Sequence, residues 1–257
     1  MPTPSARTHF LRPALAAALL LSALALGCKS RSAGREILPS NVGPSTLALR
    51  GKLIFDHTPE ETHSYTGDLL SCSNCHLESG TAAFAAPMLN VAGLYPQYSQ
   101  RAGHAITLVN RIQECFVRSE NGAPPPDSSP EMDALTAYIG WLSRDGVKGV
   151  AFPGRGLVQL PALAGNPQSG KRIFSRRCAG CHGSNGTGMP PDLPPLWGPG
   201  SFNDGAGMSH TPQLAAFVQH NMPQNRPGSL TPQQAYDVAS YIETKPRPRF
   251  DTAYRKY

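Results

Sequence analysis

Hydrophobic and polar residues recur at helical spacing in two similar parts of the chain. Segments at roughly 131–144 and 231–244 each carry a Tyr-Ile pair, and a Ser-Pro or Thr-Pro pair marks the start of each, which is typical of a helix N-terminus. A Gly-Lys-x-Ile-Phe sequence lies upstream of each segment, at 51–55 and 170–174. This repetition predicts two units of one fold, in each of which an early helix packs against a terminal helix.

A third helical pattern begins at Ala105 and surrounds an isolated cysteine. Its apolar positions are Ile106, Val109, Ile112 or Gln113, and Phe116. On a helix, Arg111, Cys115 and Arg118 fall at i, i+4 and i+7 and therefore share one face, and Arg101 lies close by in the sequence. Two guanidiniums beside a thiol favour its thiolate form and create an anion site. The alternative is a buried apolar cysteine with surface arginines.

The N-terminus carries an export signal. A 13-residue apolar run, Ala14 to Leu26, follows a basic start; it is too short to span a bilayer and predicts a secretory signal. Two processing sites fit: ordinary cleavage after Ala25, or a lipobox that ends at Cys28. The lipobox is favoured, because a lone exposed cysteine is a liability in an oxidising compartment. We therefore expect a periplasmic protein, attached to a membrane if Cys28 is lipidated.

Composition adds loops and an uneven charge to this picture. Of 257 residues, 25 are Gly and 26 are Pro, which predicts a globular, loop-rich chain. The formal net charge is +6, yet residues 38–150 carry seven basic against eleven acidic residues, and residues 151–257 carry eleven against five. The basic residues of the second half are scattered and no aromatic patch accompanies them, so we expect no nucleic-acid partner.

Six cysteines in an exported chain first suggest disulfides, but the spacing of four of them indicates haem attachment. They form two C-x-x-C-H motifs that lie 106 residues apart. In such a motif both thiols form thioethers with haem vinyl groups and the histidine binds the iron. A structural zinc site would need four converging ligands and no histidine directly after each pair. Two covalently bound haem c groups are predicted, at Cys72, Cys75 and His76 and at Cys178, Cys181 and His182.

The order helix, haem motif, long loop region and terminal helix resembles the cytochrome c fold. We therefore expect an all-α, loop-rich protein with two cytochrome c-type domains in tandem and one covalent haem in each. A stretch rich in Gly, Pro and Ala separates them. The predicted parts are a signal peptide (1–27), an N-terminal tether (28–44), the first cytochrome c domain (45–147), a linker (148–166), the second cytochrome c domain (167–245) and a C-terminal tail (246–257).

The sixth iron ligand distinguishes the two haems. In the second unit Met222 lies 40 residues after His182, just before the terminal helix, where cytochromes c usually place a methionine. Met208 is the alternative, and Met189, His210 and His220 are further candidates. A His/Met pair raises the reduction potential, so this haem should accept electrons and pass them on.

In the first unit no methionine occupies the equivalent place. Cys115 lies there instead, 39 residues after His76. The two methionines of this unit are elsewhere, Met88 in a loop and Met132 within the terminal helix. Other side chains that could face the first iron are His57, His63 and His104.

Around Cys115 the sequence resembles the thiosulfate dehydrogenase family, which comprises dihaem c-type cytochromes of sulfur metabolism. The resemblance covers about residues 45–245 and is most diagnostic near Cys115. It rests on Arg111-x-x-x-Cys115-Phe-x-Arg118-Ser119-x-Asn121-Gly122, Cys72-x-Asn-Cys75-His76-Leu77, Tyr95-Pro96-x-Tyr98, Phe202-Asn203-Asp204-Gly205-Ala206-Gly207-Met208 and Asn221-Met222-Pro223.

The resemblance implies roles for individual residues. His76 and Cys115 would hold the first iron, which is the active site of the family, and the cysteine would react with substrate sulfur. Arg101, Arg111 and Ser119 fall at positions that hold the anionic substrate, with Arg118 in reserve.

The second haem shows one departure from the family. Asn221 stands where some members carry a lysine that serves as an alternative ligand, so Met222 alone is expected to bind that iron.

The implied reaction oxidises two thiosulfates to tetrathionate. Electrons would leave through the His182/Met222 haem to an electron-accepting cytochrome or a similar redox protein. Two alternatives remain: a dihaem electron carrier without its own substrate, and the same enzyme working as a tetrathionate reductase. The arginines near Cys115 argue against the carrier, because tuning a haem requires no anion pocket. The sequence does not fix the direction.

Overall fold

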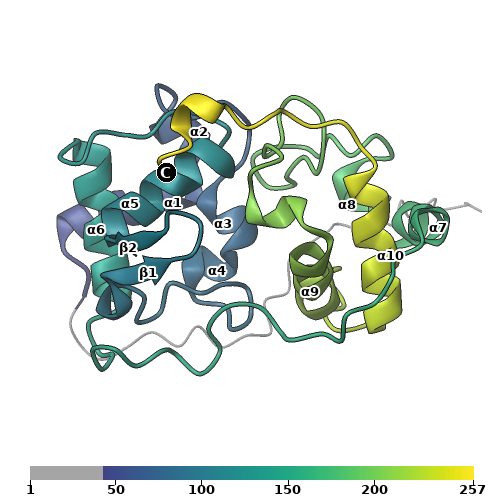
Figure 1. Ribbon diagram of the computed structural model, residues 1–257, viewed down its shortest axis with the longest axis horizontal. Helices are drawn as coiled ribbons and strands as arrows, with labels where there is room; N and C mark the ends of the chain where they lie inside the picture. The colour runs from purple at the N-terminus through teal and green to yellow at the C-terminus, as the bar shows by residue number, and fades with distance from the viewer. Residues whose placement is uncertain (1–42) are drawn as a thin grey trace, which may run out of the picture.

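A computed structural model describes residues 43–257 of the chain, which fold into two mostly helical domains that lie side by side (Figure 1). The export signal and Cys28 lie outside the described residues. Within residues 43–257, no helix is long and apolar enough to cross a membrane.

The first domain packs its first helix against its last and carries a small two-stranded sheet at its side. Strand β1 pairs with β2 in antiparallel fashion, with Tyr98 opposite Ala105. The elements are α1 (Thr46–Asp56), α2 (Thr58–Glu61), α3 (Cys72–Cys75), α4 (Leu77–Gly80), the 3-10 helix η1 (Ala92–Leu94), β1 (Gln97–Ser99), β2 (His104–Ile106), α5 (Leu108–Arg118) and α6 (Pro130–Leu142).

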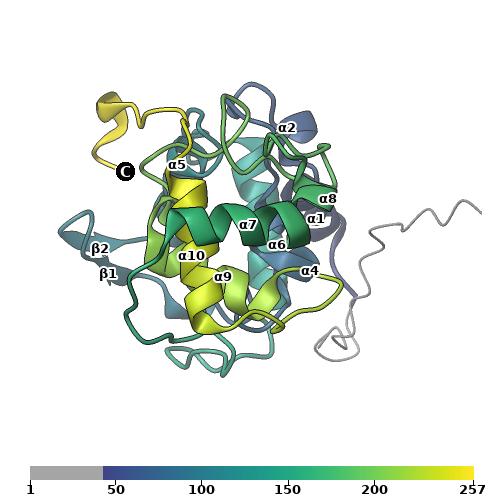
Figure 2. The ribbon, with the colours of Figure 1, turned by 90° about the vertical axis from the view of Figure 1, so that its right-hand side faces the viewer.

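The second domain repeats the arrangement and ends in a tail. Its elements are α7 (Pro167–Arg177), α8 (Ala179–His182), the 3-10 helix η2 (Gly207–Ser209), α9 (Thr211–Asn221), α10 (Pro232–Glu243) and, in the tail, η3 (Thr252–Tyr254). Figure 2 looks onto this domain and shows α7 crossing α10. Both predicted terminal helices are present, as α6 and α10.

Helix α5 begins later than the apolar pattern predicted. Ala105 and Ile106 belong to strand β2, and the helix starts at Leu108. Thr107 ends the strand and caps the helix: its hydroxyl accepts from the backbone N–H of Asn110 at 3.1 Å, and the Asn110 side chain accepts from the Thr107 backbone in return. This reciprocal cap fixes the start of the helix that carries Cys115.

The repeated Gly-Lys-x-Ile-Phe sequence is explained by helix packing. A side chain at Gly51 would lie 1.9 Å from the backbone oxygen of Ala134, and a side chain at Gly170 would lie 1.9 Å from that of Asp237. Only glycine therefore allows α1 to approach α6, and α7 to approach α10, at this distance.

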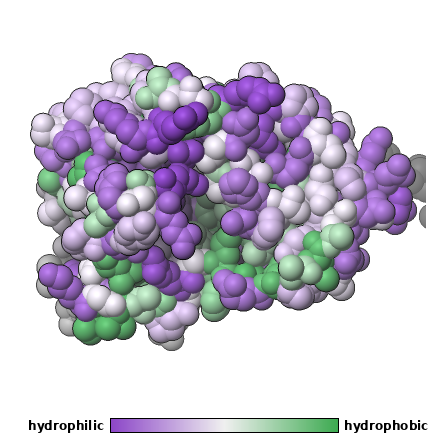
Figure 3. All heavy atoms as spheres, in the orientation of Figure 1, coloured by the Kyte–Doolittle hydropathy of each residue, from purple (hydrophilic) through white to green (hydrophobic). Residues whose placement is uncertain are grey.

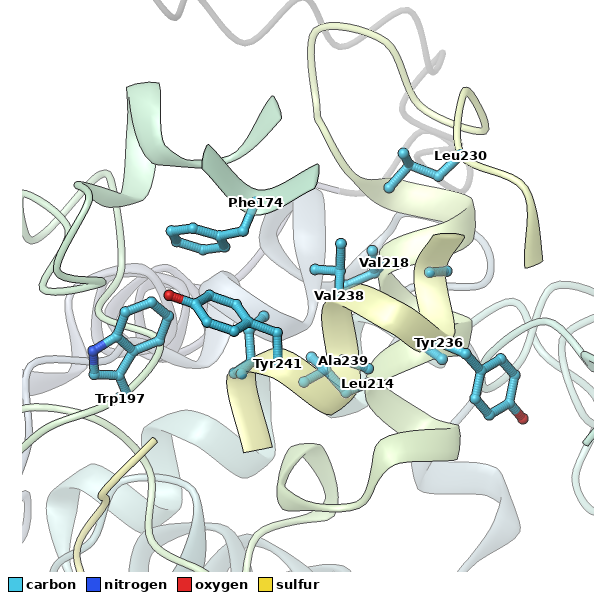
Figure 4. Close-up of a cluster of buried hydrophobic side chains, with 12 residues drawn as sticks. Phe174, Trp197, Leu214, Val218, Leu230, Tyr236, Val238, Ala239 and Tyr241 are labelled. Atoms are coloured by element: carbon cyan, nitrogen blue, oxygen red, sulfur yellow. The ribbon is translucent and has the colours of Figure 1, made fainter. Parts of the chain in front are cut away.

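The phenylalanine of each repeat packs against the tyrosine of the terminal helix. The Phe55 and Tyr138 ring centroids are 5.6 Å apart, and those of Phe174 and Tyr241 are 5.5 Å apart. Trp197 joins the second pair at 5.1 Å from Phe174 (Figure 4). The two domains thus use the same aromatic contact to join their first and last helices.

Gly51→Ala is expected to lower the free energy of unfolding by about 2 kcal/mol or more, because the new methyl group overlaps the α6 backbone. Gly140→Ala is the matched control: it lies on α6, and nothing lies within 4 Å of the added carbon. Thermal unfolding of both haem-loaded variants measures the difference. Equal thermal midpoints for the two variants would show that the close approach of α1 and α6 does not require glycine at position 51.

The C-terminal tail returns from the second domain to the first. Figure 1 shows it in yellow, passing from α10 toward α5. Asp204 holds it, because its carboxylate accepts from the Phe250 N–H at 2.7 Å and its own N–H donates to the Pro248 oxygen at 3.0 Å. The last residue, Tyr257, accepts a hydrogen bond from Arg118 of the first domain, so the tail is part of the contact between the domains.

Candidate active site

The first C-x-x-C-H motif forms a short helix followed by a held histidine. Thr58 anchors helix α3, because its hydroxyl accepts from the Cys72 N–H at 3.1 Å. His76 Nδ1 donates to the Ala86 oxygen at 2.6 Å, which fixes the ring and leaves Nε2 available to a metal. Burial lowers the pKa of His76 to about 4, so the imidazole is neutral at pH 7, as an iron ligand must be.

The histidine of the second motif is also held by a hydrogen bond to a backbone oxygen. His182 Nδ1 donates to the Pro194 oxygen at 2.9 Å, and burial lowers the pKa of this histidine as well. Two histidines in equivalent places, each oriented by a backbone carbonyl, fit the role of proximal iron ligand.

A cavity of about 250 Å³ lies beside His76 in the first domain. Both thioether cysteines, Cys72 and Cys75, line it together with the histidine. The remaining wall is mainly apolar, which suits a porphyrin ring, and includes Phe55, Met88, Val91, Ile112, Leu135 and Ile139. The residues present therefore fit a covalently attached haem. On the face drawn in Figure 3 the surface is hollowed where the two domains meet.

Helix α5 contributes Arg111, Cys115 and Ser119 to the same cavity. The Arg111 guanidinium donates to the Glu114 carboxylate at 2.9 Å, and its side chain remains 43% exposed. The negative charge of a Cys115 thiolate raises the pKa of Arg111 above its ordinary value, and Glu114 adds to this effect. The Arg111 cation therefore lies close to the Cys115 sulfur at the cavity wall.

Two predicted arginines do not line the cavity. Arg118 occupies the last position of α5 and is 8% exposed, and its guanidinium lies 4.1 Å from the Phe250 ring and donates to the main-chain oxygen of Tyr257 at 2.7 Å. Arg118 has the predicted position on α5, but its side chain does not face the cavity, because it contacts the C-terminal tail. Arg101 is exposed in the turn between β1 and β2, and its charge helps to lower the pKa of Arg118, after the larger effect of burial.

The other candidate ligands of the first iron lie elsewhere. His57, His63 and His104 are exposed, and none lines the cavity. Met132 is fully buried in α6, where it packs in the core.

Several cavity residues come from distant parts of the chain, so no local sequence pattern places them near the first haem motif. Phe202, Ala206 and Met208 belong to the second domain, and Arg155 belongs to the segment between the domains. The family motif at 202–208 was visible in the sequence, but no periodicity or spacing indicated that it faces the first haem.

This position of Met208 bears on the second iron. Met208 lines the first-domain cavity and also packs against the second-domain core, where Met222 and Cys178 pack as well. Asn221, next to Met222, is buried, and its side-chain nitrogen donates to the backbone oxygens of Phe84 and Phe217 at 3.2 and 3.1 Å. These bonds occupy the Asn221 amide in the contact between the domains.

Two buried carboxyl groups, Asp68 and Glu120, lie near Cys75. Burial, opposed by a hydrogen bond from the Leu70 N–H, raises the pKa of Asp68 to about 8. Burial, and then the charge of Asp68, raises the pKa of Glu120 well above its usual range. At neutral pH this pair therefore retains protons that two exposed carboxyl groups would have lost.

Asp68→Asn is expected to stabilise the protein more at pH 8 than at pH 5. The unfolded carboxyl group releases its proton near pH 3.8 and the folded one near pH 8, so the wild type loses stability as the pH rises between these values. The amide keeps the oxygen that bonds Leu70 and carries no charge. Thermal midpoints at both pH values give the difference, and Asp192→Asn, at an exposed position, is the control. A gain that is the same at pH 5 and pH 8 would contradict the assignment.

Two helical domains, each with a C-x-x-C-H motif and a half-buried histidine oriented by a backbone carbonyl, define a dihaem cytochrome c. Residues 167–245 match the family described as "Cytochrome c", and residues 63–147 match the one described as "SoxA/TsdA, cytochrome c domain". The chain therefore carries two covalently bound haem c groups, one in each domain.

The relatives specify the family further. The thiosulfate dehydrogenase of Psychrobacter arcticus is 42% identical over 205 residues, which are 77% of this chain and 63% of that protein. The thiosulfate dehydrogenase of Allochromatium vinosum is 40% identical over 213 residues, 79% of this chain and 78% of that protein. The protein belongs to the thiosulfate dehydrogenase family.

A solved structure shares the arrangement of both domains. The thiosulfate dehydrogenase TsdBA from Marichromatium purpuratum superposes with a TM-score of 0.76 at 37% sequence identity. The match covers 87% of this chain and 52% of that chain. This chain thus spans about half the length of that relative.

Proposed function

We propose that this protein oxidises two thiosulfate ions to tetrathionate, with Cys115 as the reacting group of the chain. One observation carries the proposal: Cys115, Arg111 and Ser119 line the same cavity as His76 and the two thioether cysteines. A thiol, a cation and a hydroxyl group thus face the first haem site together. An electron carrier would need none of these three groups.

The arginines supply positive charge that offsets the repulsion between the two thiosulfate ions. Two dianions must meet, and their repulsion has to be offset by fixed positive charge. Arg111 can hold sulfonate oxygens through the planar fork of its guanidinium, and Ser119 can add a hydrogen bond. Arg101, exposed on the turn beside α5, attracts the dianions toward the cavity.

Cys115 divides the reaction into two steps. In the first, its thiolate forms a sulfur–sulfur bond with the outer sulfur of one thiosulfate, and this bond formation releases two electrons. In the second, another thiosulfate attacks that outer sulfur, tetrathionate leaves, and the Cys115 thiolate is restored without further electron loss. Arg111 stabilises the sulfonate of the bound thiosulfate during both steps.

The two haems, when bound, can each accept one of these two electrons. In this proposal His76 and Cys115 would hold the first iron, and His182 and Met222 would hold the second. Met222 packs against the second-domain core and does not line the first cavity, whereas Met208 contacts both, and this difference supports the assignment of Met222. From the second haem the electrons would pass to an electron-accepting cytochrome or a similar redox protein.

We also infer a place of action. The apolar run at 14–26 and the lipobox-like sequence before Cys28 support export to the periplasm and attachment to a membrane through a lipidated cysteine. Labelling of the expressed protein with a radioactive fatty acid, lost in Cys28→Ser, would establish the anchor, and labelling that persists in Cys28→Ser would refute it.

The test of the activity is a steady-state assay of the haem-loaded protein with thiosulfate and ferricyanide. We expect one tetrathionate for every two thiosulfates consumed and two ferricyanides reduced. The reverse assay uses tetrathionate and a reduced dye, and the ratio of the two rates gives the preferred direction. No turnover in either assay would refute the enzyme and leave a dihaem electron carrier.

A further inference from the structure

The last turn of α5 is completed by a residue of the other domain. A helix ends with four backbone carbonyls that have no partner within it, and in α5 they belong to residues 115–118. Residues that directly follow the helix bond two of them. The Ser119 N–H donates to the Cys115 oxygen at 2.7 Å, and the Gly122 N–H donates to the Phe116 oxygen at 2.9 Å. The remaining two carbonyls need partners from elsewhere.

Asn203, in the loop before η2, bonds both of them. Its backbone N–H donates to the Arg118 oxygen at 3.2 Å, and its side-chain Nδ2 donates to the Val117 oxygen at 2.8 Å. The same Nδ2 also donates to Asn121 Oδ1 at 3.1 Å. Asn203 is 1% exposed, so solvent does not compete for these bonds.

The loop that carries Asn203 is fixed in turn. Asn203 Oδ1 accepts from the Gly205 N–H at 3.0 Å, and the Arg118 guanidinium, placed over the Phe250 ring, donates to the Gly205 oxygen at 3.4 Å. The loop also supplies Phe202, Ala206 and Met208 to the wall of the first-domain cavity. One loop of the second domain thus closes the cavity and caps the helix that carries the thiol.

We propose that Asn203 is a positioning residue for Cys115. It caps α5 from the second domain and so fixes how far the Cys115 sulfur reaches into the cavity. This inference rests on the proposed function, in which Cys115 holds the first iron and reacts with thiosulfate. Because Cys115 and Val117 belong to the same final turn, loss of the Asn203 side chain leaves the Val117 carbonyl buried without a partner and allows that turn to move.

The test compares Asn203→Ala with wild type as complete, haem-loaded proteins. A displaced sulfur should change the thiolate signature of the first haem in electron paramagnetic resonance and shift its reduction potential, while both properties of the second haem stay unchanged. The kcat for thiosulfate should fall by about tenfold or more with little change in KM, because misplacement of a reacting group costs rate rather than affinity.

Asn90→Ala is the matched control. Asn90 is also a buried asparagine whose side chain donates to two backbone oxygens, those of Val147 and Val150, and neither of these bonds is to α5. We expect a lower thermal midpoint and an unchanged first-haem signature. The same spectral change in both variants would overturn the proposal, since general destabilisation would then explain it.

The proposed role of Asn203 would also be overturned if folded Asn203→Ala kept the resonance signature and the reduction potential of the wild-type first haem. If that variant does not retain haem, Asn203→Ser, which keeps one donor, is measured in its place and judged by the same criteria. The spectra require no turnover, so the two proposals fail separately. Wild type without thiosulfate activity refutes the proposed reaction, whereas an unaltered first haem in the variant refutes the role of Asn203.

Discussion

Cys115→Ala is expected to reduce thiosulfate oxidation by roughly a thousandfold or more, because the reaction loses the sulfur that forms the covalent adduct. Both haems should remain attached, since Cys72, Cys75 and the second motif are untouched. The measurement is tetrathionate formation per haem with ferricyanide as acceptor. The absorption spectrum of the first haem should change in the same sample, because the variant lacks the proposed thiolate ligand.

Met88→Leu provides the control for this experiment. Met88 is the other sulfur side chain of the first domain that lines the cavity, apart from the cysteines. Leucine conserves its volume, so turnover should stay within about twofold of wild type. If Cys115→Ala keeps substantial activity, or if Met88→Leu removes it, then Cys115 is not the group that reacts with thiosulfate.

Arg111→Gln is expected to lower kcat/KM for thiosulfate by about a hundredfold, the usual cost of removing one charged donor from a developing anion. We expect kcat to fall and KM to rise, because the guanidinium binds the first thiosulfate and also offsets the charge of the second thiosulfate. Steady-state kinetics at several ionic strengths would measure it. Wild type should lose activity as salt is added, and the variant should lose less, because it has less positive charge to screen.

Arg118→Gln separates this effect from a general loss of positive charge. Its guanidinium packs on Phe250 and bonds the tail, outside the cavity. Its removal should lower the thermal midpoint and leave the KM for thiosulfate close to that of wild type. A KM increase in Arg118→Gln as large as that in Arg111→Gln would show that both arginines bind substrate.

The sequence predicted the features that depend on local patterns. The C-x-x-C-H motifs, the helices that became α6 and α10, and the packing of the Gly-Lys-x-Ile-Phe repeats all follow from spacing within a few residues. Cys115 and Arg111 could be placed together because they are one helical turn apart.

Contacts between distant segments could not be predicted in this way. Arg118 lies on the same face of the helix as Arg111, yet its side chain contacts the C-terminal tail. No sequence pattern near residue 118 predicts that Phe250 lies beside it. The start of α5 was placed too early because Ile106 fits a helix and a strand equally well, and pairing with β1 decides between them. The second-domain residues in the first cavity depend likewise on how the two domains meet.

That shared cavity also sets an order of events during synthesis. Asn203 follows its partner Val117 by 86 residues, so the loop at 202–208 leaves the ribosome long after the first haem motif. Until it arrives, the first domain lacks part of its cavity wall and the cap of α5. A first domain without the second would therefore have a cavity that is open along the wall formed by Phe202, Ala206 and Met208.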